Sequence, residues 1–582
     1  MKVIVANSIG VDSNGFHMVH VPSRWSLGVK SYTNCGYYPW QLAYTSSLLK
    51  RETSHDVKML DGVLNAWNFE NYFNRLAKEN PDWLIMESST RTITEDLRLV
   101  QAAKKEFGTQ LIMVGQHPMS APETVLETAD FVCIGEYEYA ALDLIRGKDP
   151  KTIPGVYPNK RGKLLDVNSL PFPEDDDVSR LDYHEPNCRY RQIQMYASRG
   201  CPRRCNFCAA ATLYYDELNW RPRKIKSIVD EIKYLSEKYP KMEGVFFDEE
   251  VHNIRSDFNT GLAQAIKAEG LDNLKYEAMC EYVSLDKNAL KEMKEAGYYK
   301  IRFGIETGSD LVAKKMTLGK KHNIKKLKEI LEYGKDLGML FYGTISVGGL
   351  GSNEIEDGKT VDLVNELAYK GWLDEIQVSI NTPQPGTDFY RYAVKNSLLK
   401  TDLNAADYDG NRHIVVEYPN YSAEQIQKKF DETFLAFDGG QEKNRALAFE
   451  SQANRNFSIF PKKSKVLVMR CSRPWMIHLV LDNLSKLRSI KPDMLGQADA
   501  MNDFQNYSNI SNKYSYESGF FSKETIPKEL VSKLQKIKYD IIIIPMINNH
   551  LDGYMNVYEV AELIQPLSIF GLYPDGTTKK LS

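Results

Sequence analysis

ASRGCPRRCNFCAA, residues 197–210, places Cys201, Cys205 and Cys208 within eight positions of a 582-residue chain that has only eight cysteines. A structural zinc site explains this stretch poorly, because such a site takes four ligands, usually as two spaced pairs, and no second pair lies nearby. A disulfide framework also fits poorly, since the other five cysteines are scattered singly, as in a reduced intracellular chain. An iron–sulfur cluster fits better, because three thiolates on a four-iron cube leave one iron open for another ligand.

The spacing C-x3-C-x2-C, with the aromatic Phe207 before the last cysteine, resembles the signature of the radical S-adenosylmethionine (SAM) enzymes. In that family three cysteines hold a [4Fe–4S] cluster, the open iron binds SAM, and an electron cleaves SAM to a 5′-deoxyadenosyl radical. The resemblance implies that Cys201, Cys205 and Cys208 are the cluster ligands and that Phe207 lies beside SAM. It also implies an external electron donor of the flavodoxin or ferredoxin type.

Composition excludes several classes of protein. The length predicts several domains, and 42% hydrophobic residues suffice for large cores. A net charge of −3 without a strongly basic stretch argues against a nucleic-acid partner. No apolar run approaches the ~20 residues of a transmembrane helix, and the N-terminus has the pattern of a buried strand, unlike a signal peptide. We therefore expect a cytoplasmic protein without a transmembrane segment.

Residues 1–150 alternate short apolar runs with amphipathic stretches. The predicted strands cover 2–7, 56–60, 82–87, 110–115 and 130–135, and the predicted helices cover 40–51, 68–79, 94–107 and 137–146. This alternation predicts βαβ units and a parallel sheet of the Rossmann or flavodoxin type. Ligands of such sheets bind beyond the carboxyl ends of the strands. The loops there are ESSTRT (87–92), GQHPMS (115–120) and GEYE (135–138).

The order of these segments resembles the cobalamin (B12)-binding domain that precedes many radical SAM cores. The matching stretches are YPWQLAY (38–44), PDWLIMESS (81–89), VGQHPMSAPET (114–124) and GEYE. The resemblance implies that cobalamin contacts Ser88, Ser89, Gly115, His117, Gly135 and Glu136. Gln116 and Tyr137 replace glycines of the family pattern, and the D-x-H-x-x-G motif that supplies a cobalt ligand is absent. A flavodoxin-like domain that has lost its cofactor is the alternative.

Residues 185–395 form a second alternating region, which follows a linker (151–184) with the Pro- and Asp-rich stretch VNSLPFPEDD. An amphipathic helix and the strand GVFF (244–247) come after the cysteines, and strand and helix then alternate to EIQVSI (375–380). The pattern gives roughly six βα units and predicts a partial (β/α)6 barrel. Functional groups of such barrels lie at the carboxyl ends of the strands.

Four stretches at these expected strand ends resemble segments of the radical SAM core. They are FFDEE (246–250), FGIETGSD (303–310), SVGGLGSNE (346–354) and NTPQPGTDFY (381–390), although Leu350 weakens the third match. Clustered carboxylates such as those of FFDEE repel one another unless a cation or an ammonium group shares the site. The resemblance implies that Asp248, Glu306, Ser309 and Gly348 contact SAM.

The chain beyond residue 395 divides into two parts. Residues 396–460 resemble the helical cap that follows the core in this class. Residues 461–582 restart an α/β pattern, with the strands SKVLVMRC (464–471) and YDIIIIPMI (539–547). The sequence of this C-terminal α/β domain suggests no definite family. The presence of this additional domain suggests a substrate larger than a metabolite, such as a carbohydrate- or lipid-linked intermediate. Alternatively, the domain mediates protein association.

Together these features predict a cobalamin-dependent radical SAM enzyme, for which methylation of an unactivated carbon is the most frequent outcome. Cyclisation or rearrangement by the same class is an alternative. A methylthiotransferase needs a second three-cysteine cluster near the N-terminus, where only Cys35 and Cys133 are available. A non-catalytic binding protein on this scaffold is a further alternative, against which the intact cysteine motif argues.

Overall fold

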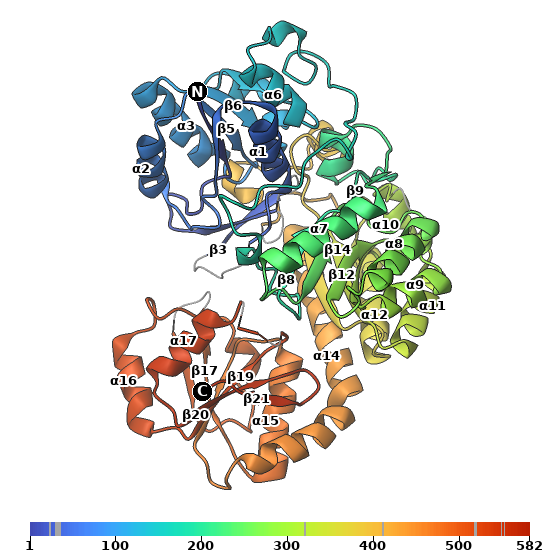
Figure 1. The fold of residues 1–582 in the computed structure, drawn as a ribbon. Helices are drawn as coiled ribbons and strands as arrows, with labels where there is room; N and C mark the ends of the chain where they lie inside the picture. The colour runs from blue at the N-terminus through green and yellow to red at the C-terminus, as the bar shows by residue number, and fades with distance from the viewer. Residues whose placement is uncertain are drawn as a thin grey trace.

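The computed structural model describes residues 1–21, 25–29, 36–318, 322–409, 413–516, 521–548, 550–551 and 553–582. Within this part of the chain, three large sheets with helices on their faces follow one another in sequence (Figure 1). The mixed α/β class predicted from the sequence is confirmed. None of the described helices is long and apolar enough to cross a bilayer.

The N-terminal sheet is parallel throughout, with the strand order β4-β1-β5-β6-β7. Its strands are β1 (Lys2–Ala6), β4 (Asp56–Leu60), β5 (Trp83–Glu87), β6 (Gln110–Val114) and β7 (Phe131–Val132). The main helices are α1 (Trp40–Glu52), α2 (Phe69–Glu79), α3 (Ile93–Phe107) and α6 (Glu138–Ile145). All five strands and all four helices were predicted. They were recognisable because strands covered by helices on both faces are continuous apolar runs.

A β-hairpin that was not predicted lies between β1 and α1. It pairs β2 (His17–Val21) with β3 (Trp25–Val29). Its buried Ser26 accepts a hydrogen bond from Ser89 Oγ at 2.7 Å, and His20 Nδ1 lies 2.5 Å from Ser26 Oγ. The hairpin therefore packs against the carboxyl end of β5, where a ligand of this sheet was expected.

The core sheet has six parallel strands in the order β15-β14-β13-β12-β11-β8. They are β8 (Gln192–Met195), β11 (Gly244–Phe247), β12 (Lys275–Cys280), β13 (Tyr298–Glu306), β14 (Leu340–Val347) and β15 (Glu375–Ile380). The intervening helices are α7 (Ile225–Lys238), α8 (Ser256–Ala268), α9 (Lys287–Glu295), α11 (Ile324–Asp336) and α12 (Glu354–Tyr369). The predicted series of parallel βα units is confirmed, whereas its curvature into a barrel stays a prediction. All carboxyl ends of these strands lie along one edge.

The long helix α14 (Ala423–Asn456) packs against α12 and leads to the C-terminal sheet (Figure 1). The strand order there is β18-β17-β16-β19-β20-β21, parallel except for β21. The strands are β16 (Val466–Met469), β17 (Asp493–Gln497), β18 (Lys513–Tyr516), β19 (Ile541–Pro545), β20 (Ser568–Leu572) and β21 (Thr578–Lys580). Helices α15 (Pro474–Arg488), α16 (Lys528–Ile537) and α17 (Met555–Leu563) cover the sheet.

Candidate active site

The three motif cysteines lie on a loop that follows the short strand β9 (Ser198–Arg199) and ends in a π-helical turn, Ala210–Tyr214. Each cysteine is half-buried. Cys205 and Phe207 pack on the apolar residues of α10 (Asp310–Lys315) and the turn after it, and Cys205 Sγ donates to Leu318 O at 2.5 Å. Burial, with a smaller electrostatic effect of Cys208, raises the pKa of the Cys201 thiol to about 12. Thiolates at this place therefore need cations beside them.

This loop, residues 201–208, fits an iron–sulfur cluster better than a single metal ion. Within the described ranges, no three Cys, His, Asp or Glu side chains gather around a point that one ion could occupy. The thiolates of a cluster bind different iron atoms, so their sulfurs surround the cluster and do not converge on one centre. The half-buried thiols of this loop are therefore compatible with a cluster, and their assignment as its ligands stays a prediction.

Carboxylates at the ends of β11 and β12 hold the cluster loop in place. Glu249, which is fully buried, accepts a hydrogen bond from the backbone N–H of Ala197 at 3.0 Å. Glu250 accepts from the backbone N–H of Gly200 at 3.2 Å. After β12, Glu281 accepts two hydrogen bonds from Arg203, at 2.7 and 3.0 Å. These positioning roles were not predicted, although the acidic run after β11 was noted.

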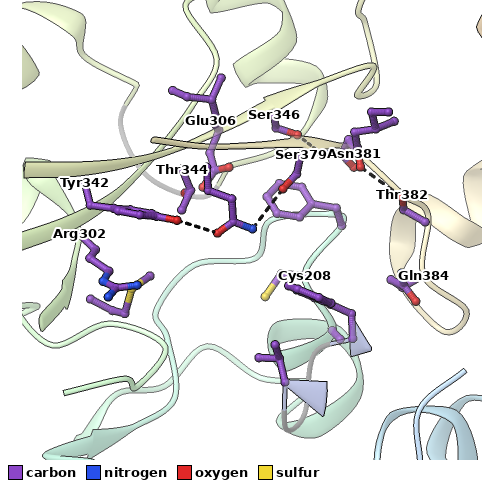
Figure 2. Close-up of a pocket in the computed structure, with 18 of the residues that line it drawn as sticks. Cys208, Arg302, Glu306, Tyr342, Thr344, Ser346, Ser379, Asn381, Thr382 and Gln384 are labelled. Carbon is purple, nitrogen blue, oxygen red and sulfur yellow. Dashed lines mark hydrogen bonds between the residues drawn. The ribbon is translucent and has the colours of Figure 1, made fainter. Parts of the chain in front are cut away.

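A cavity of about 330 Å³ opens beside the cluster loop, at the carboxyl ends of the core strands (Figure 2). This volume lies in the range of ~300–1,000 Å³ that small-molecule sites have. Figure 2 shows the Cys208 sulfur directed toward the strand ends that carry Glu306, Thr344 and Ser379. Val21 and Trp25 of the N-terminal hairpin also line the cavity. The cavity therefore has walls from both the core and the N-terminal region.

The predicted SAM-binding residues fall into two groups. Phe207, Asp248 and Glu306 line the cavity. Ser309 and Gly348 are not among its lining residues: Ser309 Oγ accepts from the N–H of Val312 and so caps α10, while the N–H of Gly348 donates to Asp357 at 2.9 Å. The assignment of these two residues to SAM therefore stays a prediction, and each has a structural role of its own.

Glu306 has a backbone conformation that non-glycine residues rarely adopt. Its φ is +65°, and the register between β13 and β14 shifts between Gly304 and Glu306. A left-handed conformation of this kind costs about 1–3 kcal/mol and persists only where the surroundings enforce it. The irregularity turns the end of β13 at the point where it reaches the cavity.

Polar side chains at every second position of β14 and β15 form one wall of the cavity. Tyr342 OH donates to Gln377 Oε1 at 3.3 Å, and Gln377 Nε2 donates to Ser379 Oγ at 3.4 Å. Asn381 Nδ2 donates to Ser346 Oγ at 2.9 Å (Figure 2). These residues were not predicted. The signal was present, however, because polar residues with a period of two interrupt otherwise apolar strands.

Arg302 provides a fixed positive charge at the cavity. Its guanidinium is buried between Glu185 and Glu277. Although burial opposes the charge, these two carboxylates hold the pKa of Arg302 well above its ordinary value. Arg302 therefore remains protonated, and its three guanidinium nitrogens already donate to Glu277, Glu185 and Cys188.

Gln384 is the clearest sign that the cavity binds a ligand. Its side chain is only 6% exposed and lines the cavity, and within the described chain neither its Oε1 nor its Nε2 has a hydrogen-bond partner. Buried polar groups without a partner are rare, because each costs about 1–3 kcal/mol. A bound molecule would supply the missing partners.

Three of the six predicted cobalamin contacts are side chains that already form hydrogen bonds within the protein. Ser88 Oγ donates to Asp96 at 2.6 Å, and Ser89 Oγ donates to Ser26 of the hairpin. Glu136 accepts two hydrogen bonds from Arg221, at 2.8 and 2.9 Å. These side chains hold the loops in shape, so cofactor contacts from these positions would fall mainly to backbone groups.

The remaining predicted positions are compatible with a close backbone approach. Gly115 and Gly135 have φ values of +102° and +82°. A Cβ at Gly115 would lie 2.6 Å from Ser88 O, so this position has no room for a side chain. His117 Nδ1 lies 3.1 Å from Thr90 Oγ1, and burial lowers the pKa of His117 to about 4. His117 is therefore neutral near pH 7.

Gln116, which departs from the family pattern, links the N-terminal region to the core. Its Oε1 accepts from the N–H and the hydroxyl of Thr90, both at 2.9 Å. Its Nε2 donates to Pro385 O at 3.0 Å. The loop after β6 is thereby fixed against the turn that ends the core.

Comparison with known proteins finds a matching family for the N-terminal region and another for the core. The B12 binding domain matches residues 36–145, and the Radical SAM superfamily matches residues 195–364. An uncharacterized methyltransferase of Pyrococcus horikoshii is 25% identical over 69% of this chain and 87% of its own length. Hopanoid C-3 methylase of Methylococcus capsulatus is 22% identical over 62% of this chain and 72% of its own.

The fold agrees with that of a solved enzyme. The radical SAM methyltransferase TsrM of Kitasatospora setae, with cobalamin and a [4Fe–4S] cluster bound, superposes with a TM-score of 0.56 at 13% identity, over 75% of this chain and 88% of TsrM. The two matched domains lie in the order that the sequence predicts, and the cluster loop lies at the cavity. The chain belongs to the B12-dependent radical SAM enzymes, with a [4Fe–4S] cluster, SAM and cobalamin as its cofactors.

Proposed function

We propose that this enzyme transfers a methyl group to an unactivated carbon of its substrate. The observation that carries the proposal is the cavity beside Cys208, which has walls from the cluster loop and from the N-terminal hairpin. A substrate held there could meet groups supplied from both parts of the chain. The names of both curated relatives described above, a methyltransferase and a methylase, support the same reaction class.

The bound cofactors supply the radical chemistry and the methyl group, and the protein positions the reactants and excludes water. We assign the cluster to Cys201, Cys205 and Cys208. Asp248 and Glu306 are expected to accept hydrogen bonds from the ammonium group of SAM, since both carboxylates belong to the cavity wall. The charge of Arg302 and the amide of Gln384 are left to orient the substrate.

We assign a role to each part of the chain. Residues 1–150 carry cobalamin, 151–184 form the linker, 185–395 form the radical SAM core, 396–460 form the helical cap, and 461–582 form the C-terminal α/β domain. An external flavodoxin- or ferredoxin-type protein is the expected electron donor. We place the reaction in the cytoplasm, because the seven described cysteines are all free thiols, as is usual in a reducing compartment.

A methylthiotransferase is less favoured on structural grounds. It would need a second set of three cysteines near the N-terminus. Cys133 is fully buried in the N-terminal core, where burial raises its pKa to about 12. Cys35 lies outside the described residues. The N-terminal region therefore offers no second ligand set from which to argue for this activity.

Isotope labelling in cells tests methyl transfer without knowledge of the substrate. Cells that express the chain would be grown without oxygen on trideuteromethyl methionine, beside cells that express the variant with Cys201, Cys205 and Cys208 changed to alanine. We expect at least one compound that carries an additional trideuteromethyl group only in the cells with the parent chain. Identical labelled profiles, from a parent chain that holds iron and cobalamin, would contradict the proposal.

A further inference from the structure

A second cavity, of about 760 Å³, lies where the hairpin, the core and the C-terminal α/β domain meet. We call it the distal cleft. Its walls include Trp25 of the hairpin, Val378 of β15, Phe434 of α14, and Arg470 and Tyr554 of the C-terminal domain. The C-terminal domain, for which the sequence suggested no definite role, therefore contributes to a cavity together with the catalytic core.

The distal cleft adjoins the cavity at Cys208. Trp25, Tyr37, Tyr342 and Gln377 line both cavities. A single molecule could therefore reach from the cluster loop to the C-terminal domain. Since the cavity at Cys208 is only about 330 Å³, the larger part of such a molecule would lie in the distal cleft.

The C-terminal domain presents its ligand-binding edge to this cleft. Its strand order reverses between β16 and β19, the point at which open parallel sheets bind ligands beyond their strands. The residues that follow these strands, 470–474 after β16 and Ile547 after β19, line the distal cleft. The position of these residues in the cleft favours a ligand-binding role for the C-terminal domain over a purely structural one.

The cleft has the chemistry of an amphiphile site. Aromatic and aliphatic side chains dominate its walls, among them Trp25, Phe430, Phe434, Phe521, Tyr554 and Val557. The charged side chains of the lining are Glu185, which pairs with Arg302, Arg473, which pairs with Asp438, and Arg470. The Arg470 side chain is 11% exposed and pairs with the half-exposed Asp503 at 3.1 Å, and its Nε has no hydrogen-bond partner among the described residues. A buried guanidinium N–H without an acceptor indicates that a ligand supplies one.

We infer that the distal cleft holds the body of the substrate, an amphiphile with an extended apolar part and one anionic group that binds at Arg470. The reacting carbon of this molecule would lie in the cavity beside Cys208. The inference rests on the proposed function for the reaction, but the binding itself can be tested without turnover.

Binding of cis-parinaric acid, a fluorescent fatty acid, to the reconstituted full chain provides the test. We expect the parent to bind it, and Ala500→Trp, which fills the cleft, to weaken binding at least about tenfold. Ala498→Trp is the matched control, because Ala498 is exposed, belongs to the same segment and does not line the cleft. Arg470→Gln should weaken the acid about 10- to 100-fold while leaving its methyl ester unchanged.

Iron content should match the parent in all three variants, which shows that each variant is folded around an intact cluster. Equal binding to Ala500→Trp and the parent would overturn the inference, as would equal effects of Arg470→Gln on the acid and the ester. A parent that binds the acid but yields no methylated product in labelled cells would instead refute the proposed function. The two failures are therefore distinguishable.

Discussion

Arg203→Ala should loosen the cluster loop without touching a thiolate. Arg203 lies between Cys201 and Cys205 and donates two hydrogen bonds to Glu281, whose side chain is only 5% exposed. Hydrogen bonds to charged groups contribute about 1.5–3 kcal/mol. Among the described residues, the loss of Arg203 leaves Glu281 with Ser284 as its remaining side-chain donor. Because Arg203 itself is 27% exposed, solvent screening favours the lower half of that range, about 2 kcal/mol.

If the cluster loop loses about 2 kcal/mol of stabilisation, the population of its locally opened state rises about 30-fold. The assay is the anaerobic rate at which a ferrous chelator removes iron from the reconstituted protein, which should rise by about this factor. Arg204→Ala is the matched control, since Arg204 is 41% exposed and its partners Asp216 and Asp388 are 54% and 36% exposed. Its loss should change the rate less than about fivefold. Equal rates for Arg203→Ala and the parent, or equal effects of the two variants, would refute the reasoning.

Three further results are expected. Asp248→Asn and Glu306→Gln should each weaken SAM binding about tenfold in equilibrium dialysis, while the iron content stays unchanged. An affinity for SAM equal to that of the parent in both variants would show that neither residue belongs to the SAM site. Cys188→Ala should retain the full iron content, because this buried thiol lies against Arg302 and not in the cluster loop. Loss of iron from a folded Cys188→Ala variant would contradict the assignment of Cys201, Cys205 and Cys208 as the cluster ligands. The pKa of His117 is about 4 in the folded protein, against a reference value of 6.5 for an exposed histidine. As the pH drops from 6.5 to 4, the unfolded chain is therefore protonated before the folded one, and the free energy of unfolding decreases. His117→Gln should reduce this loss by up to about 3 kcal/mol, and an unchanged difference in melting temperature between neutral and acidic buffer would show that His117 is not the buried neutral group.

The sequence predicted the parallel sheets well because their strands are buried on both faces. The runs KVIVA of β1 and IIIIP of β19 are fully apolar in their interiors and therefore visible without tertiary information. The hairpin β2–β3 and the strands β17, β18, β20 and β21 were missed, since none of them is a continuous apolar run. Their burial depends on neighbours that are distant in the sequence, and propensity alone does not identify such strands.

The site was predicted where chemistry constrains spacing. The three cysteines assigned to the cluster lie on one short loop with a defined spacing, so Cys201, Cys205 and Cys208 were recognisable from the sequence. The direction of a side chain after a strand is instead set by tertiary contacts. In FFDEE, Asp248 lines the cavity, whereas Glu249 and Glu250 hold the cluster loop. The polar cavity wall on β14 and β15 was not predicted, because its residues form one surface only when the two strands pair side by side.

Release of 5′-deoxyadenosine tests the central claim most directly. The full chain, reconstituted anaerobically with iron and sulfide, would be incubated with SAM and dithionite, beside the variant with Cys201, Cys205 and Cys208 changed to alanine. We predict that the parent releases 5′-deoxyadenosine and that the folded variant, which lacks the cluster, releases none. Equal release by both proteins, or no release by a parent with a full complement of iron, would contradict the assignment of this chain as a radical SAM enzyme.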